Sequence, residues 1–456
     1  MLSLIRKLLN TKTNGRYQSI PFAPVKQELT HTAFDIEGII PEELNGTYLR
    51  NGPNPAGPIS PNAHYFSGDG MVHGVRLKAG KVLWYRNRFV RGGSVSKTLG
   101  EKEIGGPVSN GLDVSPNTNI IRFKNTLYAT IEAGPSMIQL SPELDSISRS
   151  NLEGILAEGF TGHHKIDPED KDIHGVVYCN KLGNNALYIR LKQDGSLLNK
   201  VTVPLSGASQ IHDMAITKNY AIILDLNVVF STSALLKTTL PIAWQDKKAS
   251  RVGVLPKGGT ADQIRWFEVS PCYVYHPLNA FEDAQGNIVL DVSRYERASL
   301  KDYYGPLGDT EPSIDRWTLP MNSSEKKAKE DRLFNLPLDF PKVNPQFEGR
   351  SYQYGYTVEA TLKPSFERAV KLNLMTSEVE YQAFDGGMSS ELTFIPRENA
   401  TTEDDGWLIG FVFQPEKQQS RLVILDAKKF SEPPVASIWI PEQYVPIGTH
   451  GGWFPN

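Results

Sequence analysis

Short apolar strands separated by turn residues recur from residue 30 to the end of this chain. A typical pair, 72–78 and 82–90, flanks Ala79-Gly80-Lys81, a hairpin with glycine at its turn. Helical periodicity is scarce, and the strands do not alternate with helices as they would around a parallel sheet. The pattern therefore predicts an all-β fold. The strands predicted most clearly are 46–50, 72–78, 82–90, 120–123, 127–131, 176–178, 186–191, 220–226, 287–292 and 407–413.

A propeller accommodates this many strands better than a single sandwich does. The 456 residues would overfill one sandwich, whereas a propeller adds length as blades around a central axis. No clean repeat marks the blades, so spacing alone does not give their number. No linker divides residues 31–456, which are predicted to form one domain with its long insertions as loops over one face. The charged stretch 323–331 is predicted to be a short surface helix or loop.

Residues 1–30 are predicted to form a separate N-terminal segment. Its first nine residues combine aliphatic side chains with Arg6 and Lys7, and they lack the small-residue cleavage site of a secretory signal. They are predicted to form an amphipathic helix in contact with a membrane surface, or else a frayed terminal turn or a helix packed on the domain. No run of 18 apolar residues is present, so no membrane-spanning helix is expected.

Net charge and cysteine content indicate which compartment and which partners to expect. The net charge is -3, so there is no basic excess for phosphates and nucleic acid is not an expected partner. Cys179 and Cys272 are the only cysteines, which indicates a reducing compartment rather than a disulfide framework. We therefore expect a cytoplasmic protein, with peripheral membrane contact if the N-terminal segment binds lipid.

Four of the nine histidines lie in short stretches of similar character. Spacings of 49, 64 and 174 residues separate them, far too wide for a zinc finger or an HExxH helix. Such spacings suit four ligands delivered to one axial point by different strands. Four imidazoles without a thiolate favour Fe(II), and a six-coordinate ion would keep open positions for O2 chemistry. The alternative is that each histidine caps a strand or turn. The four are His163, His212, His276 and His450, with His276 expected where the strand 273–275 meets its loop.

Together with two stretches near the N-terminus, these histidine stretches resemble the carotenoid cleavage oxygenase family, which includes carotenoid, apocarotenoid and stilbene dioxygenases and the retinal pigment epithelial isomerase. The N-terminal stretches are 44–55 (LNGTYLRNGPNP) and 66–74 (FSGDGMVHG), and the resemblance runs from about residue 42 to 456. It implies a seven-bladed β-propeller with a non-haem Fe(II) on its axis. It also implies a dome of loops and helices over an apolar tunnel on one face.

The resemblance also implies roles for individual residues. It assigns the Fe(II) ligands to His163, His212, His276 and His450. Glu132, Asp339 and Glu391 match carboxylates that orient the ligand imidazoles. Asp339 stands where the family usually has Glu, and its shorter side chain predicts a longer or water-bridged hydrogen bond.

Two other histidines lie close to the family motifs. His164 stands where the family commonly has Pro, which leaves a choice between His163 and His164 as the first ligand. The offset to Asp167-Pro168 favours His163. His73 lies in a family motif but matches no ligand, so it is predicted to be structural.

The reaction implied is oxidative cleavage of a conjugated C=C bond by O2, giving two carbonyl products. Stilbene-cleaving members typically have a Lys just before the first carboxylate and a Tyr in the strand 87–91, whereas this chain has Ile131 and Phe89. A buried phenol left without these partners would lose about 1–3 kcal/mol. We therefore expect a hydrophobic polyene, a carotenoid or apocarotenoid. The alternatives are a stilbene or phenylpropene substrate, an isomerase or hydrolase on the same iron site, and a non-catalytic propeller that serves as a binding scaffold.

Overall fold

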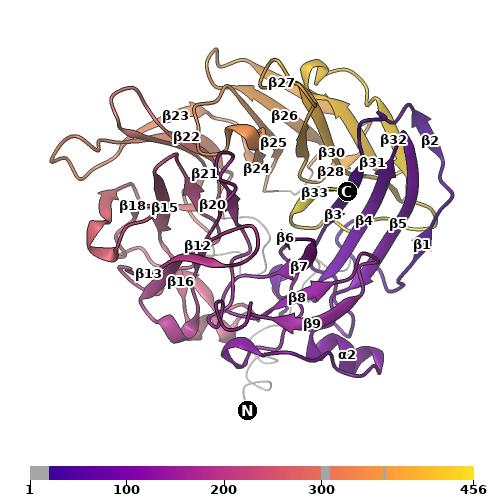
Figure 1. Ribbon diagram of the computed structural model, residues 1–456, viewed down its shortest axis with the longest axis horizontal. Coiled ribbons are helices and arrows are strands. Elements are labelled where there is room, and N and C mark those ends of the chain that lie inside the picture. Colours follow the sequence, from indigo (N-terminus) through magenta and orange to yellow (C-terminus); the bar gives the residue numbers. More distant parts are fainter. Residues whose placement is uncertain (1–19, 299–308, 363–365) are drawn as a thin grey trace.

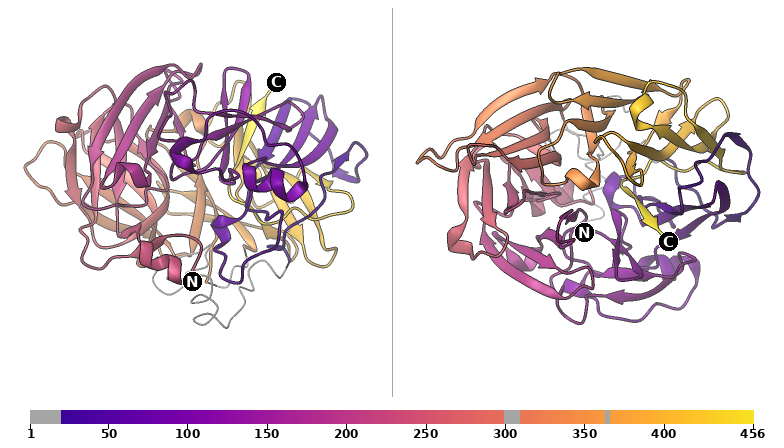
Figure 2. Two further views of the ribbon diagram at one scale, coloured as in Figure 1. Left: turned by 90° about the horizontal axis from the view of Figure 1, so that it is seen from below. Right: turned by 45° about the horizontal axis from the view of Figure 1, so that its top comes forward.

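Seven β-sheets follow one another around a central axis in the computed structural model, which describes residues 20–298, 309–362 and 366–456 (Figure 1). Each of the seven has four or more strands, and one further two-stranded hairpin is inserted in the fourth. The ring is plain in the tilted view of Figure 2. The chain is thus an all-β, seven-bladed propeller, as predicted.

The blades are built from consecutive antiparallel strands. Blade 1 contains β1 (Thr30–His31), β5 (Lys81–Phe89), β4 (Met71–Lys78), β3 (Gly46–Arg50) and β33 (Gly451–Pro455). Blade 2 contains β6 (Asn119–Phe123), β7 (Thr126–Thr130), β8 (Met137–Leu140) and β9 (Ser146–Ser150). Blade 3 contains β10 (Lys165–Ile166), β11 (Ile173–Val177), β12 (Asn185–Leu191) and β13 (Leu197–Pro204). Blade 4 contains β14 (Ala215–Ile216), β15 (Tyr220–Asp225), β18 (Arg251–Pro256) and β19 (Arg265–Glu268), with the hairpin β16 (Val228–Phe230) and β17 (Ile242–Trp244).

The remaining three blades follow the same plan. Blade 5 contains β20 (Tyr273–Glu282), β21 (Ile288–Tyr295), β22 (Ser313–Leu319) and β23 (Lys329–Phe334). Blade 6 contains β24 (Leu338–Lys342), β25 (Tyr354–Glu359), β26 (Arg368–Asn373) and β27 (Val379–Ala383). Blade 7 contains β28 (Met388–Ser389), β29 (Thr393–Pro396), β30 (Gly406–Gln414), β31 (Gln419–Asp426), β32 (Ala436–Trp439) and β2 (Ile36–Gly38).

The two ends of the described chain close the ring by exchanging strands between the first and last blades. The C-terminal β33 pairs with β3 in blade 1, where Trp453 lies opposite Tyr48. Near the N-terminus, β2 pairs with β32 in blade 7, where Ile36 lies opposite Ile438. Closure joins blades that are far apart in sequence, so the ring is closed by strands from both ends of the described chain.

Apolar side chains fill the spaces between neighbouring blades. Leu224 and Val252 of blade 4 and Tyr273, Leu290 and Trp317 of blade 5 belong to one buried cluster. Such packing lets each sheet bury both faces, which explains why β30 reads as nine consecutive buried residues. The one α-helix among the described residues, α2 (Gly93–Leu99), ends at Gly100, whose φ of 70° suits glycine.

Two local expectations differ from the structure in part. Of the two alternatives for the charged stretch 323–331, residues 323–328 form the loop, with a bridge between Lys327 and Glu268, whereas residues 329–331 belong to β23. His276 does not lie at a strand end: β20 continues through it to Glu282, with an irregular register between Val274 and Pro277. Pro277 lacks an N–H for a regular ladder, so a bulge is its natural place in a strand.

The predicted membrane contact of residues 1–9 lies outside the described residues. The chain that follows packs on the propeller, where Phe22 and Val25 are buried. Within the described ranges, we find no helix with both the length and the apolar character needed to cross a membrane.

Candidate metal centre

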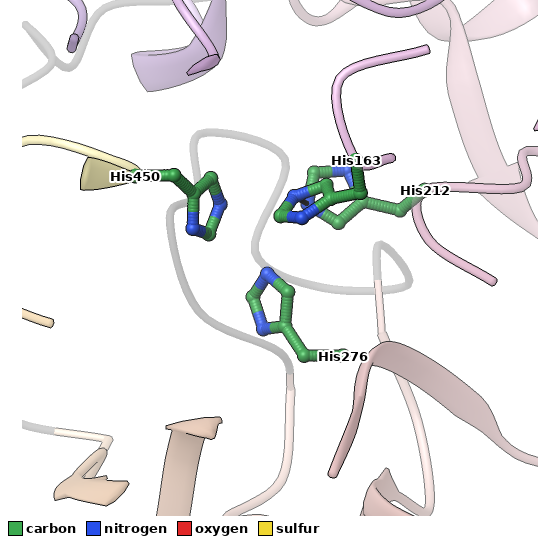
Figure 3. A group of neighbouring side chains, drawn as sticks. All are labelled: His163, His212, His276 and His450. Atoms are coloured by element: carbon green, nitrogen blue, oxygen red, sulfur yellow. Dashed lines mark hydrogen bonds between the residues drawn. The ribbon is translucent and has the colours of Figure 1, made fainter. Parts of the chain in front are cut away.

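Four buried imidazoles meet near the axis of the propeller. The potential ligand atoms of His163, His212, His276 and His450 all lie within 4.8 Å of one another. Figure 3 shows the four rings turned toward a common point. The structure brings together the four histidines that the sequence singled out. His163 belongs to this group and His164 does not.

Each of these histidines comes from the innermost strand of a blade or from the residues just before it. His163 precedes β10 in blade 3, and His212 precedes β14 in blade 4. His276 lies within β20 of blade 5, and His450 precedes β33 of blade 1. The loop at His163 is fixed by Thr161, whose hydroxyl accepts from the backbone N–H of His163 at 3.0 Å and donates to its carbonyl at 2.8 Å.

The other three blades supply carboxylates that hold these imidazoles. Nδ1 of His212 lies 3.1 Å from Oε1 of Glu132, which follows β7 of blade 2. Nδ1 of His450 lies 2.6 Å from Oε2 of Glu391, which lies between β28 and β29 of blade 7. A carboxylate fixes the tautomer of its imidazole with the proton on Nδ1, which leaves Nε2 to face the centre. With Asp339 of blade 6, every blade contributes one of these four histidines or three carboxylates.

Asp339 contacts His276 directly, so the expectation of a longer or water-bridged bond was wrong. Oδ1 of Asp339 lies 2.8 Å from Nδ1 of His276, a shorter distance than that between Glu132 and His212. The carboxylate is brought close because Asp339 lies on β24 itself, where Phe340 N–H donates to the same oxygen at 2.8 Å. The hydroxyl of Tyr295 donates to the other oxygen at 2.6 Å.

The protonation states follow from burial and from these pairs. Burial lowers the pKa of His163 well below its ordinary value, and the neighbouring imidazoles add to this effect. Burial likewise brings the pKa of His450 to about 4 despite the opposing effect of Glu391. Burial would raise the pKa of Glu391, but Lys342 and His450 outweigh it and bring the pKa to about 2. At neutral pH these two histidines are thus neutral and the carboxylate is charged, as metal binding requires.

The donor set suits a divalent transition metal. Nε2 of His163 lies 3.0 Å from Nε2 of His212, and Nε2 of His276 is buried without a hydrogen-bond partner. Nitrogens that share an ion at about 2 Å lie roughly this close to one another. Four imidazoles without thiolate or coordinating carboxylate favour iron, zinc, copper or nickel over magnesium or calcium. The residues present therefore fit such an ion.

Several contacts around the centre were missed by the sequence reasoning. Oδ2 of Asp213 lies 3.8 Å from Nδ1 of His163 and accepts from Lys165 at 3.0 Å. Asp213 directly follows His212, so its position was a signal that could have been used. Tyr295 gave no such signal, because only the folding of β21 beside β24 brings it to Asp339.

Aromatic rings cover part of the centre. The Phe66 ring stacks on His212 with the ring centroids 6.5 Å apart, and Tyr275 meets the same imidazole edge-on at 5.6 Å. The Phe340 ring lies 5.2 Å from His276 and 5.8 Å from His450. These rings exclude water from the imidazoles and offer an apolar surface next to them. His73 takes no part in the site: it is fully buried with Nδ1 2.9 Å from the hydroxyl of Tyr85.

A second group, Asp167, Asp170 and His174, also lies close enough to hold an ion. Its carboxylates are engaged by cationic side chains. Asp167 contacts Lys257 and Arg350, and Arg190 donates to Asp170 at 2.8 Å. These cations neutralise the negative charge of the carboxylates that would otherwise attract a metal ion. The four-histidine group is therefore the better metal site.

A propeller that carries a four-histidine centre held by carboxylates defines a class of metal-dependent enzyme. A family model described as retinal pigment epithelial membrane protein matches residues 22–455. A carotenoid cleavage oxygenase of Mycobacterium tuberculosis is 33% identical over 95% of this chain and 96% of its own length. The crystal structure of Pseudomonas brassicacearum lignostilbene dioxygenase superposes with a TM-score of 0.86 at 25% identity, covering 98% of this chain and 99% of that one. Cobalt-substituted Synechocystis apocarotenoid oxygenase gives 0.84 at 28% identity, covering 95% and 98%.

The chain belongs to the carotenoid cleavage oxygenase family. Both the sequence and the structural similarity extend over nearly its whole length. It is accordingly an enzyme of the dioxygenase type, and the alternative of a non-catalytic scaffold is not supported.

Proposed function

We propose that this enzyme uses Fe(II) and O2 to cleave a conjugated C=C bond of a carotenoid or apocarotenoid into two carbonyl products. The observation that carries the proposal is the set of four converging imidazoles, three of them bonded to carboxylates. His163, His212, His276 and His450 would hold the iron. When bound, the iron would supply the activation of O2, which no side chain can provide.

The protein's own contribution would be orientation and exclusion of water. Three carboxylates would each keep the proton on Nδ1 of the imidazole that they contact, so that Nε2 of that imidazole stays available to the metal. They are Glu132, Asp339 and Glu391. Phe66 and Phe340 would hold an apolar polyene against the imidazoles and keep the site dry. No general acid or base is needed beyond the metal site.

The substrate class rests on two apolar positions. Phe89 is buried in a cluster with Val25, Met71 and Val95, and Ile131 directly precedes Glu132. Neither side chain can hydrogen-bond a phenol, whereas an apolar polyene needs no such partner. A 4-hydroxystilbene is the second candidate, because the lignostilbene dioxygenase structure superposes on this one over nearly the whole chain.

Product analysis with competing substrates tests the proposal. Iron-loaded protein is incubated in air with an apocarotenal and a 4-hydroxystilbene together, and the aldehydes are identified by chromatography and mass. Shortened apocarotenals alone are the expected result and would also locate the cleaved bond. Aromatic aldehydes alone would contradict the substrate class, and the absence of aldehydes from both would contradict the proposed cleavage of these two alkene classes. Contact of the N-terminal segment with a membrane, which would help to reach such substrates, stays a prediction.

A further inference from the structure

A cavity of about 640 Å³, lined by polar and apolar side chains alike, reaches the four-histidine centre. His163 and His276 form part of its wall, so two of the four imidazoles border this cavity as well as the centre itself. The aromatic rings of Phe66, Tyr275 and Phe340 are not among its lining residues. The centre therefore has an aromatic side, covered by these three rings, and another side that opens to the cavity. The polar side chains in the cavity wall offer oxygen and nitrogen ligands to a hydrated ion.

His164 lies in the wall of this cavity, directly after His163 in the chain. Nδ1 of His164 is enclosed without a hydrogen-bond partner. The three imidazoles that face a carboxylate are held in one orientation, but no such bond holds the ring of His164. A free imidazole can turn and present either nitrogen to a cation.

Carboxylates line the inner part of the same cavity. Asp213 is paired with Lys165 at 3.0 Å, and Glu391 is paired with Lys342 at 3.1 Å. Glu348 adds a third carboxylate to the wall. Arg122 and the exposed Lys124 also line the cavity, and with Lys165 and Lys342 the wall has four basic and three acidic side chains. The imidazole of His164 must therefore supply the attraction for a cation.

We propose that a divalent metal ion enters the four-histidine centre through this cavity, with His164 as a transit ligand that passes the ion to His163 and His276. The inference rests on the proposed metal centre. The step is ligand exchange: each imidazole nitrogen replaces one water of the hydrated ion, and no electron is transferred. The aromatic side is unsuitable because it would strip the ion of water without replacing it.

The rate of metal uptake tests the route. Protein freed of metal by a chelator is mixed with Co²⁺, the reaction is quenched with excess chelator at intervals, and bound cobalt is counted by mass spectrometry after desalting. His164→Gln keeps a polar side chain but removes the imidazole. Thr393→Trp narrows the cavity from another part of its wall. His31→Ala, which removes an imidazole that does not line the cavity, is the control. Circular dichroism and thermal unfolding of the metal-free variants show whether each is folded.

Both cavity variants are expected to take up cobalt about tenfold more slowly, because substitutions next to metal ligands typically have effects of this size. Both should reach the same final content of bound metal. An uptake rate equal to that of the wild type in either folded variant would overturn the proposed route. A lower final content in His164→Gln would make His164 a resident ligand and would also overturn its transit role. No uptake by the wild type would instead refute the metal centre on which the inference rests.

Discussion

Asp339 and His276 are 63 residues apart in the chain, yet Oδ1 of the first lies 2.8 Å from Nδ1 of the second. Burial would raise the pKa of Asp339, but His276 and Tyr295 outweigh it and keep the pKa below its ordinary value. The carboxylate is thus charged while it holds the imidazole. Asp339 holds the imidazole directly although its side chain is shorter than that of glutamate, because β24 brings it close to the ring.

Asp339→Asn is expected to weaken metal binding by roughly 10–100-fold, the usual effect of removing a carboxylate behind a ligand histidine. The amide can accept a hydrogen bond but carries no charge to stabilise the Nδ1 proton. Asp339→Glu keeps the charge with a longer side chain and should lose less. Metal affinity measured by competition with a chelator checks both variants. Equal affinity of Asp339→Asn and the wild type would contradict this role.

His276→Ala is expected to abolish stoichiometric metal binding, because it removes one of the four converging nitrogens. His73→Ala is the matched comparison: His73 is also buried and bonded to a side chain, but it lies outside the four-histidine group. It should lower thermal stability and still bind one metal ion per chain. Metal analysis of both purified proteins separates the two cases. Metal loss in folded His73→Ala would show that the ligand assignment is incomplete.

The double variant Ile131→Lys with Phe89→Tyr is expected to gain cleavage of 4-hydroxystilbene and to lose part of its activity on apocarotenals. The new ammonium and hydroxyl groups would provide the partners that a buried phenol lacks, an interaction of about 1–3 kcal/mol. Steady-state rates on both substrates measure the change. Ile131→Met is the control, because it alters the side chain at this position without adding a polar group. No change in the ratio of the two rates would mean that these positions do not set substrate class.

Asp225→Asn is expected to lower the free energy of unfolding by about 3–5 kcal/mol, because it leaves Lys248 buried without its counter-charge. Asp225 is fully buried, and its oxygens contact Lys248 at 2.6 Å and Arg251 at 2.8 Å. Denaturant unfolding of metal-free protein at pH 7 measures the loss. Glu416→Gln, a change of an exposed carboxylate in the turn between β30 and β31, should have little effect.

The same ion pair predicts how stability depends on pH. Burial opposes the charge of Asp225, but Lys248 and the hydroxyl of Ser209 outweigh it and keep the pKa below its ordinary value of 3.8. A carboxylate with a lowered pKa stabilises the folded state above the unfolded value and loses that contribution as pH falls below it. The wild type should therefore lose stability below about pH 3.8 more steeply than Asp225→Asn. Parallel slopes for the two proteins would contradict the assignment.

The sequence by itself determined the all-β class, the four histidines that converge at the centre and the family. Strands and turns are signalled by neighbouring residues, so 46–50 was predicted with its observed bounds and 407–413 lies within β30. The histidine stretches could be recognised because each is a local motif. Local signals could not show that β20 continues through His276, since the bulge at Pro277 depends on pairing with β21.

Only the tertiary structure decided which carboxylate meets which histidine and what else surrounds the centre. The bonded pairs are 80, 63 and 59 residues apart, and each joins two different blades. The sign of each pKa shift depends on burial and on charges that closure of the ring brings together. The aromatic side and the cavity side of the centre arise in the same way, because Phe66, Phe340 and His164 come from separate parts of the chain. Local sequence signals do not predict these distances, since they are set when seven blades pack around one axis.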